Sequence, residues 1–300
     1  MHNAPHVISR IMATQIETNP PGSATNGRRK SKPKTPFSIS PNPNNLYFTP
    51  SLEAAVFRTR FCVEQRQGLA VIIGAVGLGK TSLVRYLHTD FDSSEDTVSV
   101  LIPTPTFKTE FAMIANICQL VGLPPRRSAQ KYQSDLEGWL QEQYSQDFNV
   151  VLFIDEAQKL TDSMLEMVRA FLNFETNEEK LVQIVLAGQM ELSNRLRSQQ
   201  HKPLYSRMIA PTVMSTLTVE EVSGMIAHRC KLHKLSNPFP AETVERLWML
   251  TGGIPRETLR VCSMAYEMSK LANLEEVPVE LLEMAYQEMQ LRADDAEAEA

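Results

Sequence analysis

The stretch Val71-Ile-Ile-Gly-Ala-Val-Gly-Leu-Gly-Lys-Thr-Ser82 decides the fold of this chain of 300 residues. It contains the spacing Gly74-x4-Gly79-Lys80-Thr81, which is the full pattern of a phosphate-binding loop. An apolar run from Leu69 to Ile73 precedes the loop, and a helix-like stretch follows it. Because a buried strand, a glycine-rich loop and a helix in this order form a phosphate cradle, the stretch predicts a nucleoside triphosphate site.

Small and polar residues of this loop are expected to supply the phosphate contacts. Gly74, Gly77 and Gly79 have no Cβ, so backbone N–H groups can approach phosphate closely, and the next helix directs its positive end at the anion. Lys80 is expected to reach the β- and γ-phosphates, and the Thr81 hydroxyl to bind Mg²⁺. The predicted nucleotide-binding residues of the loop are Gly74, Val76, Gly77, Leu78, Gly79, Lys80, Thr81 and Ser82.

A second apolar run, Val150 to Ile154, ends in two carboxylates. Such a run is typical of a central strand that is buried on both faces, and its end would lie beside the phosphate loop. Asp155 is then predicted to hold Mg²⁺, through water, and Glu156 to polarise the attacking water as a general base. The alternative is an acidic helix start, since Asp and Glu favour helix N-termini.

Composition and charge set the class of protein. A hydrophobic content of 43% is enough for a real core, and four widely spaced cysteines without a C-x-x-C pair suggest neither a zinc site nor a disulfide framework. No apolar run approaches the roughly 18 residues of a membrane span, and the N-terminus lacks the apolar core of a signal peptide. These features predict a cytoplasmic protein.

The two ends of the chain carry opposite charge, within a net charge of −5. Residues 1–35 are predicted to be a disordered basic arm, because they are polar and end in Arg28-Arg-Lys-Ser-Lys-Pro-Lys34. Such an arm either binds phosphate backbones or an acidic partner, or acts only as a solubilising tail. Residues 293–300 are predicted to form a solvated acidic tail.

Hydrophobic periodicity predicts strands alternating with helices, followed by helices alone. The predicted elements are a helix over 50–65, a strand over 69–73, the loop helix over 82–88, a strand over 98–103, helices over 107–120 and 134–146, a strand over 150–154, a helix over 161–175, a strand over 181–187, and helices over 219–235, 241–250, 256–271 and 279–292. This order predicts an α/β fold over residues 36–215, with a parallel sheet covered by helices on both faces. A small all-helical lid is predicted over 216–292.

Six segments carry a resemblance to a known family. They are Pro36-Phe-Ser-Ile-Ser-Pro-Asn-Pro43, Gly74–Thr81, Phe153-Ile-Asp-Glu-Ala-Gln158, Leu172-Asn-Phe-Glu175, Val185-Leu-Ala-Gly-Gln189 and Gly253-Ile-Pro-Arg256. In this order they resemble the AAA+ ATPases, and more narrowly the ExeA-type group, which is also similar to transposition regulators of the TnsC, TniB and MuB kind. The resemblance covers residues 36–270 and implies a P-loop NTPase that uses ATP and Mg²⁺.

The resemblance also implies roles for three further residues. Gln189 is similar to the sensor-one polar residue, which orients the attacking water or contacts the γ-phosphate, although a plain strand-end turn is the alternative. Arg256 is similar to the sensor-two arginine, which couples the lid to the γ-phosphate. Arg207 is similar to a trans-acting arginine finger, with Arg195 and Arg197 as nearby competitors. A shared site requires copies of the chain to assemble head to tail, in a ring or a helical filament.

The resemblance leaves three functions open. Secretion ATPases of the ExeA type usually carry a membrane span and a wall-binding region, and this sequence shows neither, which favours the transposition regulators. Those are expected to polymerise on duplex DNA with ATP and to couple target-selection proteins to a transposase. Lys108 is the candidate phosphate contact to DNA, with Arg126 and Arg127 as further candidates. A secretion or envelope-assembly ATPase and a nucleotide-gated scaffold are the alternatives.

Overall fold

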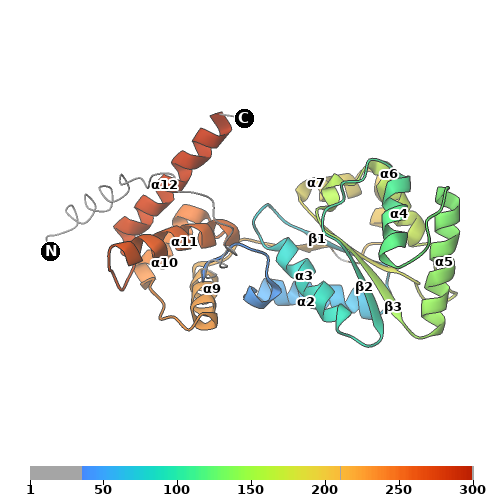
Figure 1. Ribbon diagram of the computed structural model, residues 1–300, viewed down its shortest axis with the longest axis horizontal. Coiled ribbons are helices and arrows are strands. Elements are labelled where there is room, and N and C mark those ends of the chain that lie inside the picture. The colour runs from blue at the N-terminus through green and yellow to red at the C-terminus, as the bar shows by residue number, and fades with distance from the viewer. Residues whose placement is uncertain (1–35, 210, 299–300) are drawn as a thin grey trace, which may run out of the picture. The chain divides into compact units, whose positions relative to one another are not determined.

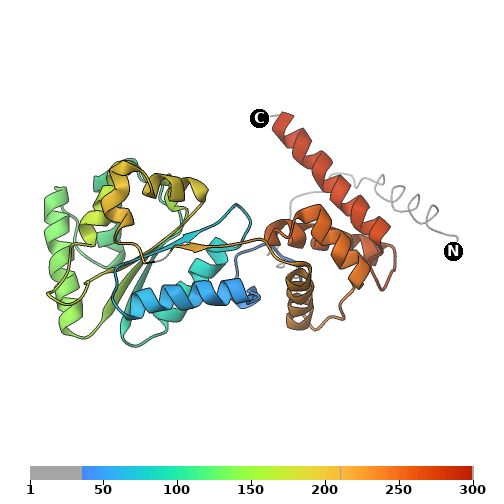
Figure 2. The same cartoon turned by 180° about the vertical axis from the view of Figure 1, so that it is seen from behind.

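The computed structural model describes residues 36–209 and 211–298, with side chains through residue 290. These residues form two compact units (Figure 1 and Figure 2). The first consists of the described residues within Pro41–Ser215, and the second of residues 36–40 and 216–298. The predicted basic arm, residues 1–35, lies outside the described residues, as do the last two residues of the predicted acidic tail.

A five-stranded sheet in the order β2-β3-β4-β1-β5 forms the centre of the first unit. The strands are β1 Leu69–Ile73, β2 Thr97–Ile102, β3 Asn149–Ile154, β4 Gln183–Gly188 and β5 Thr212–Val213. All pairings are parallel, and β4 pairs with both β1 and β3. The loops that follow these three strands therefore meet at one edge of the sheet, where parallel sheets bind their ligands.

Helices cover both faces of this sheet (Figure 1). The helices of the unit are α2 Pro50–Glu64, α3 Lys80–Asp92, α4 Glu110–Leu120, α5 Ala129–Ser145, α6 Asp162–Phe171, α7 Met190–Leu196 and α8 Lys202–Tyr205. Side chains alternate along each strand, so α2 and α3 bury Ile72 and Phe153, while α4, α5 and α6 bury Val71 and Leu152. The α/β fold with helices on both faces of a parallel sheet is thus confirmed.

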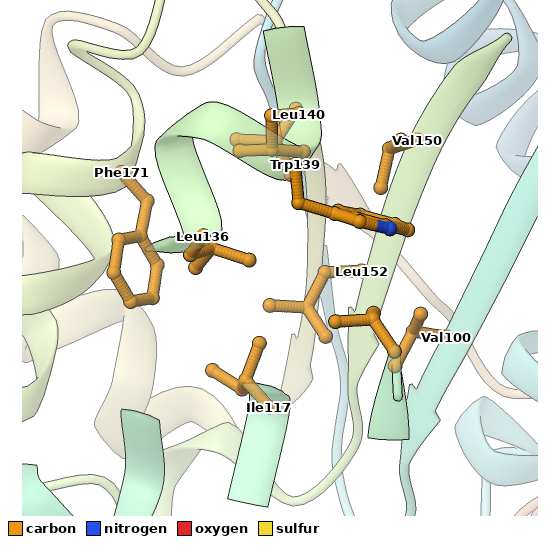
Figure 3. Close-up of a pocket in the computed structure, with 10 residues that line it drawn as sticks. Val100, Ile117, Leu136, Trp139, Leu140, Val150, Leu152 and Phe171 are labelled. Atoms are coloured by element: carbon orange, nitrogen blue, oxygen red, sulfur yellow. The ribbon is translucent and has the colours of Figure 1, made fainter. Parts of the chain in front are cut away.

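The apolar face of α5 packs against β3. Leu136, Trp139 and Leu140 extend from this helix toward the strand, where Val150 and Leu152 lie (Figure 3). Between them remains a cavity of about 20 Å³, lined by apolar and aromatic side chains. A space of this size without polar partners does not hold water, so it is a packing gap rather than a ligand site.

The second unit consists of helices. They are α9 Val219–Leu232, α10 Ala241–Thr251, α11 Pro255–Leu271 and α12 Val279–Ala298. The segment before residue 41 packs here, because the buried ring of Phe37 contacts Phe239 and Tyr266 edge-on, with centroids 5.4 and 5.6 Å apart. Residues 36–40 therefore accompany the helical unit, although the sequence predicts them at the start of the α/β domain.

Several element boundaries differ from the predicted ones. Helix α6 ends at Phe171, not at Glu175, because the chain then folds back and the Leu181 N–H donates to the Phe174 carbonyl (2.9 Å). Helix α5 begins earlier than predicted, because the Ser128 side chain caps its first turn. Helix α12 continues to Ala298, past the predicted end at residue 292, because Ala and Glu favour helix.

Three short elements are absent from the sequence prediction. β5 has only two residues, so it shows no alternation of polar and apolar positions. Helices α7 and α8, of seven and four residues, are too short for a clear helical period. In the part of the chain that the structure describes, no helix is long and apolar enough to cross a membrane.

Candidate functional site

The phosphate loop joins β1 to α3 and has the backbone geometry that an anion cradle needs. Gly77 and Gly79 have φ of 85° and 93°, in the left-handed region that favours glycine. Close packing also favours glycine at Gly74, since a Cβ there would come within 3.1 Å of Met214 Cβ. Among the described residues no side chain caps the start of α3, which leaves its first N–H groups to an anionic ligand.

The other predicted loop residues lie around this cradle. Val76 is exposed at the tip of the loop, whereas Leu78 is buried beneath it. Thr81 and Ser82 occupy the first turn of α3 and are half-buried. Lys80 is buried, and its Nζ donates to the carbonyls of Gly74 and Ala75, at 2.9 Å each. The ammonium group is therefore held inside the loop, where a triphosphate would bind.

Asp155 follows β3 and is 2% exposed. Burial raises the pKa of the Asp155 carboxyl, while a hydrogen bond with the Thr81 side chain and the charge of Lys80 act in the opposite direction. The fold thus brings the two predicted Mg²⁺ ligands together. The described residues contain no group of three or more His, Cys, Asp or Glu that could hold a metal. The pair fits Mg²⁺, which takes few protein ligands together with phosphate oxygens and water.

Glu156 adopts a left-handed backbone conformation, with φ of 53°. Its N–H donates to Asp155 Oδ1 (2.8 Å), and its Oε2 accepts from Gln158 Nε2 (2.8 Å). Lys159 Nζ lies 3.8 Å from the same oxygen. Gln158 thus holds the half-buried carboxylate next to the predicted Mg²⁺ ligand Asp155, where the sequence predicts a base for the attacking water.

Gln189 follows β4, the strand between β1 and β3. Its backbone N–H donates to Gln158 Oε1 (3.2 Å), and the residue is half-buried. It lies at the sheet edge expected for a polar residue that senses the γ-phosphate. Its role stays a prediction.

The three candidate finger arginines have different surroundings. Arg195 donates to the carbonyls of Gln158 (3.1 Å) and Leu160 (2.7 Å) and pairs with Asp162 (2.5 Å). Hydrogen bonds from Arg195, and then from His201, lower the pKa of Asp162. These contacts commit Arg195 to its own chain and disfavour it as a finger.

The other two arginines are held by fewer hydrogen bonds within the chain. Arg207 is half-buried, and its Nη1 donates to the carbonyl of Arg169 (3.1 Å) and to the side chain of Asn173. Arg197 is exposed, and its side chain makes no hydrogen bond or ion pair with other described residues. Both remain candidates for a contact with a neighbouring copy.

Arg256 lies in the first turn of α11, in the helical unit, and is exposed. The turn before it depends on Gly253, because φ is 68° there and a Cβ would come within 2.1 Å of the Leu217 carbonyl oxygen. The helix start that carries Arg256 is therefore well defined within this unit. Its sensor-two role stays a prediction.

The candidate DNA contacts also differ from one another. Lys108 is exposed on a loop whose neighbour Phe107 packs against the core, so the backbone that carries it is anchored. Arg126 pairs with Asp135, which occupies its guanidinium group. Arg127 is exposed. The structure thus leaves Lys108 and Arg127 as the accessible members of this set.

Two further residues have no role in the sequence prediction: Gln158 in the site, and His201 beside the pair of Asp162 and Arg195. Gln158 contacts Glu156 and Gln189, and buried His201 lies 3.0 Å from Asp162 through Nε2. Their partners are up to 39 positions away in the chain. The sequence signals one of these two residues, because Gln158 lies inside the quoted motif. The contacts themselves cannot be predicted from the sequence, because residues so far apart in the chain meet only in the folded protein.

Comparison with known proteins finds a family match for part of the chain. Residues 63–196 match the family described as AAA domain. The chain is similar to General secretion pathway protein A of Aeromonas hydrophila, with 32% identity over 233 residues. The match covers 77% of this chain but 42% of that protein, so this chain spans less than half of the relative's length.

Solved structures with a similar fold include proteins of the ORC and Cdc6 type. The Aeropyrum pernix ORC2 protein matches with a TM-score of 0.61 at 15% identity, covering 84% of this chain and 71% of that one. Cdc6p from Pyrobaculum aerophilum matches at 0.60 and 17%, covering 81% and 67%. A chain of Drosophila ORC bound to DNA matches at 0.60 and 17%, covering 96% and 74%. These likenesses show the P-loop AAA fold.

Replacing Asp155 should raise the stability of the free protein and weaken its binding of Mg²⁺ with ATP. The raised pKa of Asp155 means that its ionised form disfavours the fold above that pKa, even with Lys80 nearby. In Asp155→Asn, we expect the melting temperature at pH 8 to rise by about 2–4 °C, and the stabilisation by Mg²⁺ with ATP to be lost. The gain in melting temperature should shrink as the pH is lowered, because the wild-type carboxyl, with its raised pKa, takes up its proton.

Thermal unfolding at pH 8 and at lower pH, with and without Mg²⁺ and ATP, measures this. Glu95→Gln, which removes an exposed carboxylate, is the matched control and should change neither quantity. A lower melting temperature of Asp155→Asn at pH 8 would contradict the interpretation.

Proposed function

Because residues 63–196 match the family described as AAA domain, we propose that this chain is an ATP-dependent regulator that assembles head to tail on duplex DNA and couples target selection to a transposase. ATP favours the assembled state, and hydrolysis favours release. The observation that supports this proposal most is that five residues gather at the ends of neighbouring parallel strands and in the loops that follow them. They are Lys80, Thr81, Asp155, Glu156 and Gln189.

The proposed chemistry assigns one task to each of these residues. Lys80 and the loop N–H groups bind the β- and γ-phosphates. Thr81 and Asp155 hold Mg²⁺, which neutralises the phosphate charge when bound. Glu156 accepts the proton of the attacking water, and Gln189 orients that water from the end of β4.

The neighbouring copy supplies the remaining positive charge in this proposal. Arg207 leaves the Arg169 carbonyl and Asn173 and reaches the nucleotide of the next subunit, where it stabilises the transition state. Arg256 couples the helical unit to the γ-phosphate, so that this unit responds to bound ATP. A contact that is heterologous in this way generates a ring or a filament.

Two features support duplex DNA as the partner. Lys108 is exposed on an anchored loop, and the Arg28–Lys34 segment has five basic residues in seven. One protein with a similar fold is described as bound to DNA. Repeated lysine contacts along a filament would bind phosphate without reading sequence.

The second candidate is an ATPase of a secretion or envelope-assembly system. The similarity to General secretion pathway protein A favours this candidate. The chain is 32% identical to that protein, but only 15% to 17% identical to the solved structures named above. In that case the same ATPase cycle would act on another protein rather than on DNA. ATP-dependent DNA binding separates the two candidates.

A test of the shared site uses three arginine variants. We expect Arg207→Ala to lower ATP turnover at least about tenfold, because a finger acts on the transition state, while ATP binding changes little. Mixing Arg207→Ala with Lys80→Ala protein should restore part of the turnover, since a wild-type Lys80 site then meets a wild-type Arg207. Arg197→Ala changes the competing position and should leave turnover unchanged, and Arg195→Ala should lower stability as well.

Steady-state ATPase assays over a range of protein concentrations measure this. Turnover that depends neither on mixing nor on protein concentration would mean that one chain holds a complete site. If Arg197→Ala shows the loss and Arg207→Ala does not, the finger is Arg197.

DNA binding is tested by anisotropy titration of a labelled duplex in low salt. With ATP and Mg²⁺, we expect binding with little sequence preference and an affinity that falls steeply with salt, because lysine and arginine side chains displace condensed counterions. Lys108→Ala should weaken binding to all sequences alike. Deletion of residues 1–34 should weaken it less, since an arm adds avidity only.

Glu110→Gln, beside the same loop, is the control and should not weaken binding. No ATP-dependent shift up to tens of micromolar protein, near the upper range of nonspecific binding, would reject the DNA proposal. The secretion candidate would then stand.

A further inference from the structure

Gln158 touches both sides of the ATPase site. Its Nε2 donates to Glu156 Oε2 (2.8 Å), and its Oε1 accepts from the backbone N–H of Gln189 (3.2 Å). A carboxylate needs a donor and an N–H needs an acceptor, so these two partners fix which end of the amide faces which. The side chain thus bridges the turn after β3 and the end of β4.

The backbone around Gln158 is held as firmly as its side chain. Arg195 donates to the carbonyl of Gln158 at 3.1 Å and to that of Leu160 at 2.7 Å, which fixes the turn that carries the amide. On the other side, Gly188 lets the amide approach β4, because a Cβ there would lie 3.1 Å from Gln158 Oε1 and 2.7 Å from Leu192 Cδ2. The position of the amide is therefore determined by the fold.

Glu156 needs such support. Its left-handed backbone, with φ of 53°, is uncommon for a residue with a side chain and persists only when its surroundings hold it. Its neighbouring charges are Asp155, whose Oδ1 accepts the Glu156 N–H, and Lys159, whose Nζ lies 3.8 Å from Oε2. Lys159 is half exposed, and Gln158 makes the shorter contact with the carboxylate, at 2.8 Å.

We propose that Gln158 is a positioning residue of the ATPase: its amide aims the Glu156 carboxylate at the attacking water and ties that carboxylate to the end of β4 at Gln189. This inference rests on the proposed role of Glu156 as the base. It goes further, because Gln158 would link the proposed base, Glu156, to the proposed sensing residue, Gln189. A shift of β4 or of Gln189 on binding ATP would then move Glu156 into or out of place.

Two substitutions of Gln158 test the linkage. Gln158→Met keeps the length of the side chain but removes both hydrogen bonds. It should lower kcat by about tenfold to a hundredfold, with KM for ATP within about twofold, because the phosphate loop is unchanged. Gln158→Glu keeps an acceptor for the Gln189 N–H but sets a second carboxylate against Glu156. The acidic limb of its kcat profile should move to higher pH by about one unit or more, because two carboxylates in contact share a proton.

The reference variants are Glu156→Gln and Lys159→Met, assayed beside the wild type. Lys159→Met should stay within about twofold of wild-type kcat, because an exposed ion pair contributes little. Melting temperatures identify any unfolded variant, and the pH shift of Gln158→Glu is a signature that lost stability does not produce. Inactive Glu156→Gln together with wild-type kcat and pH profile in both Gln158 variants would overturn the positioning role alone. Wild-type turnover in Glu156→Gln would overturn the assignment of the base, and the inference with it.

Discussion

The parallel pairing of β4 with β1 on one side and β3 on the other is the constraint on which the site depends. It sets the ends of three strands side by side, and each end carries one part of the proposed chemistry. The phosphate loop follows β1, the two carboxylates follow β3, and Gln189 follows β4. Residues that are distant in the sequence meet because parallel strands deliver their carboxyl ends to one edge.

The site contains buried charged side chains and an uncommon backbone conformation, both of which cost stability. Lys80 and Asp155 are buried, and Glu156 has a left-handed backbone. Burying a charge costs about several kcal/mol unless partners offset it. Main-chain carbonyls hold Lys80, and hydrogen bonds with Thr81 and the Glu156 N–H partly offset the burial of Asp155. The buried charges and the left-handed residue persist because the surrounding sheet, with its fully buried central strands, supplies the stability.

The sequence predicts the parts of the structure that repeat a strong local pattern. The strand at Leu69–Ile73 and the loop after it are such cases, because apolar runs and glycine spacing are local signals. The fold-back after Phe171 and the two-residue strand β5 depend on contacts across the sheet and have no local signal. In the site, the sequence identifies the chemical groups but not their supports. Gln158, which bridges Glu156 and Gln189, and Arg195, which holds the Gln158 carbonyl, become visible only when the chain is folded.

Both candidate functions require the same first event, which is the capture of ATP by the loop around Lys80. The account therefore depends most directly on the affinity for ATP, measured by isothermal titration calorimetry in the presence of Mg²⁺. Wild-type protein is expected to bind ATP, and Lys80→Ala to bind it at least about tenfold more weakly with the fold unchanged by circular dichroism, because it lacks the charge-assisted contact to phosphate. Equal affinities of the two proteins for ATP would contradict the account.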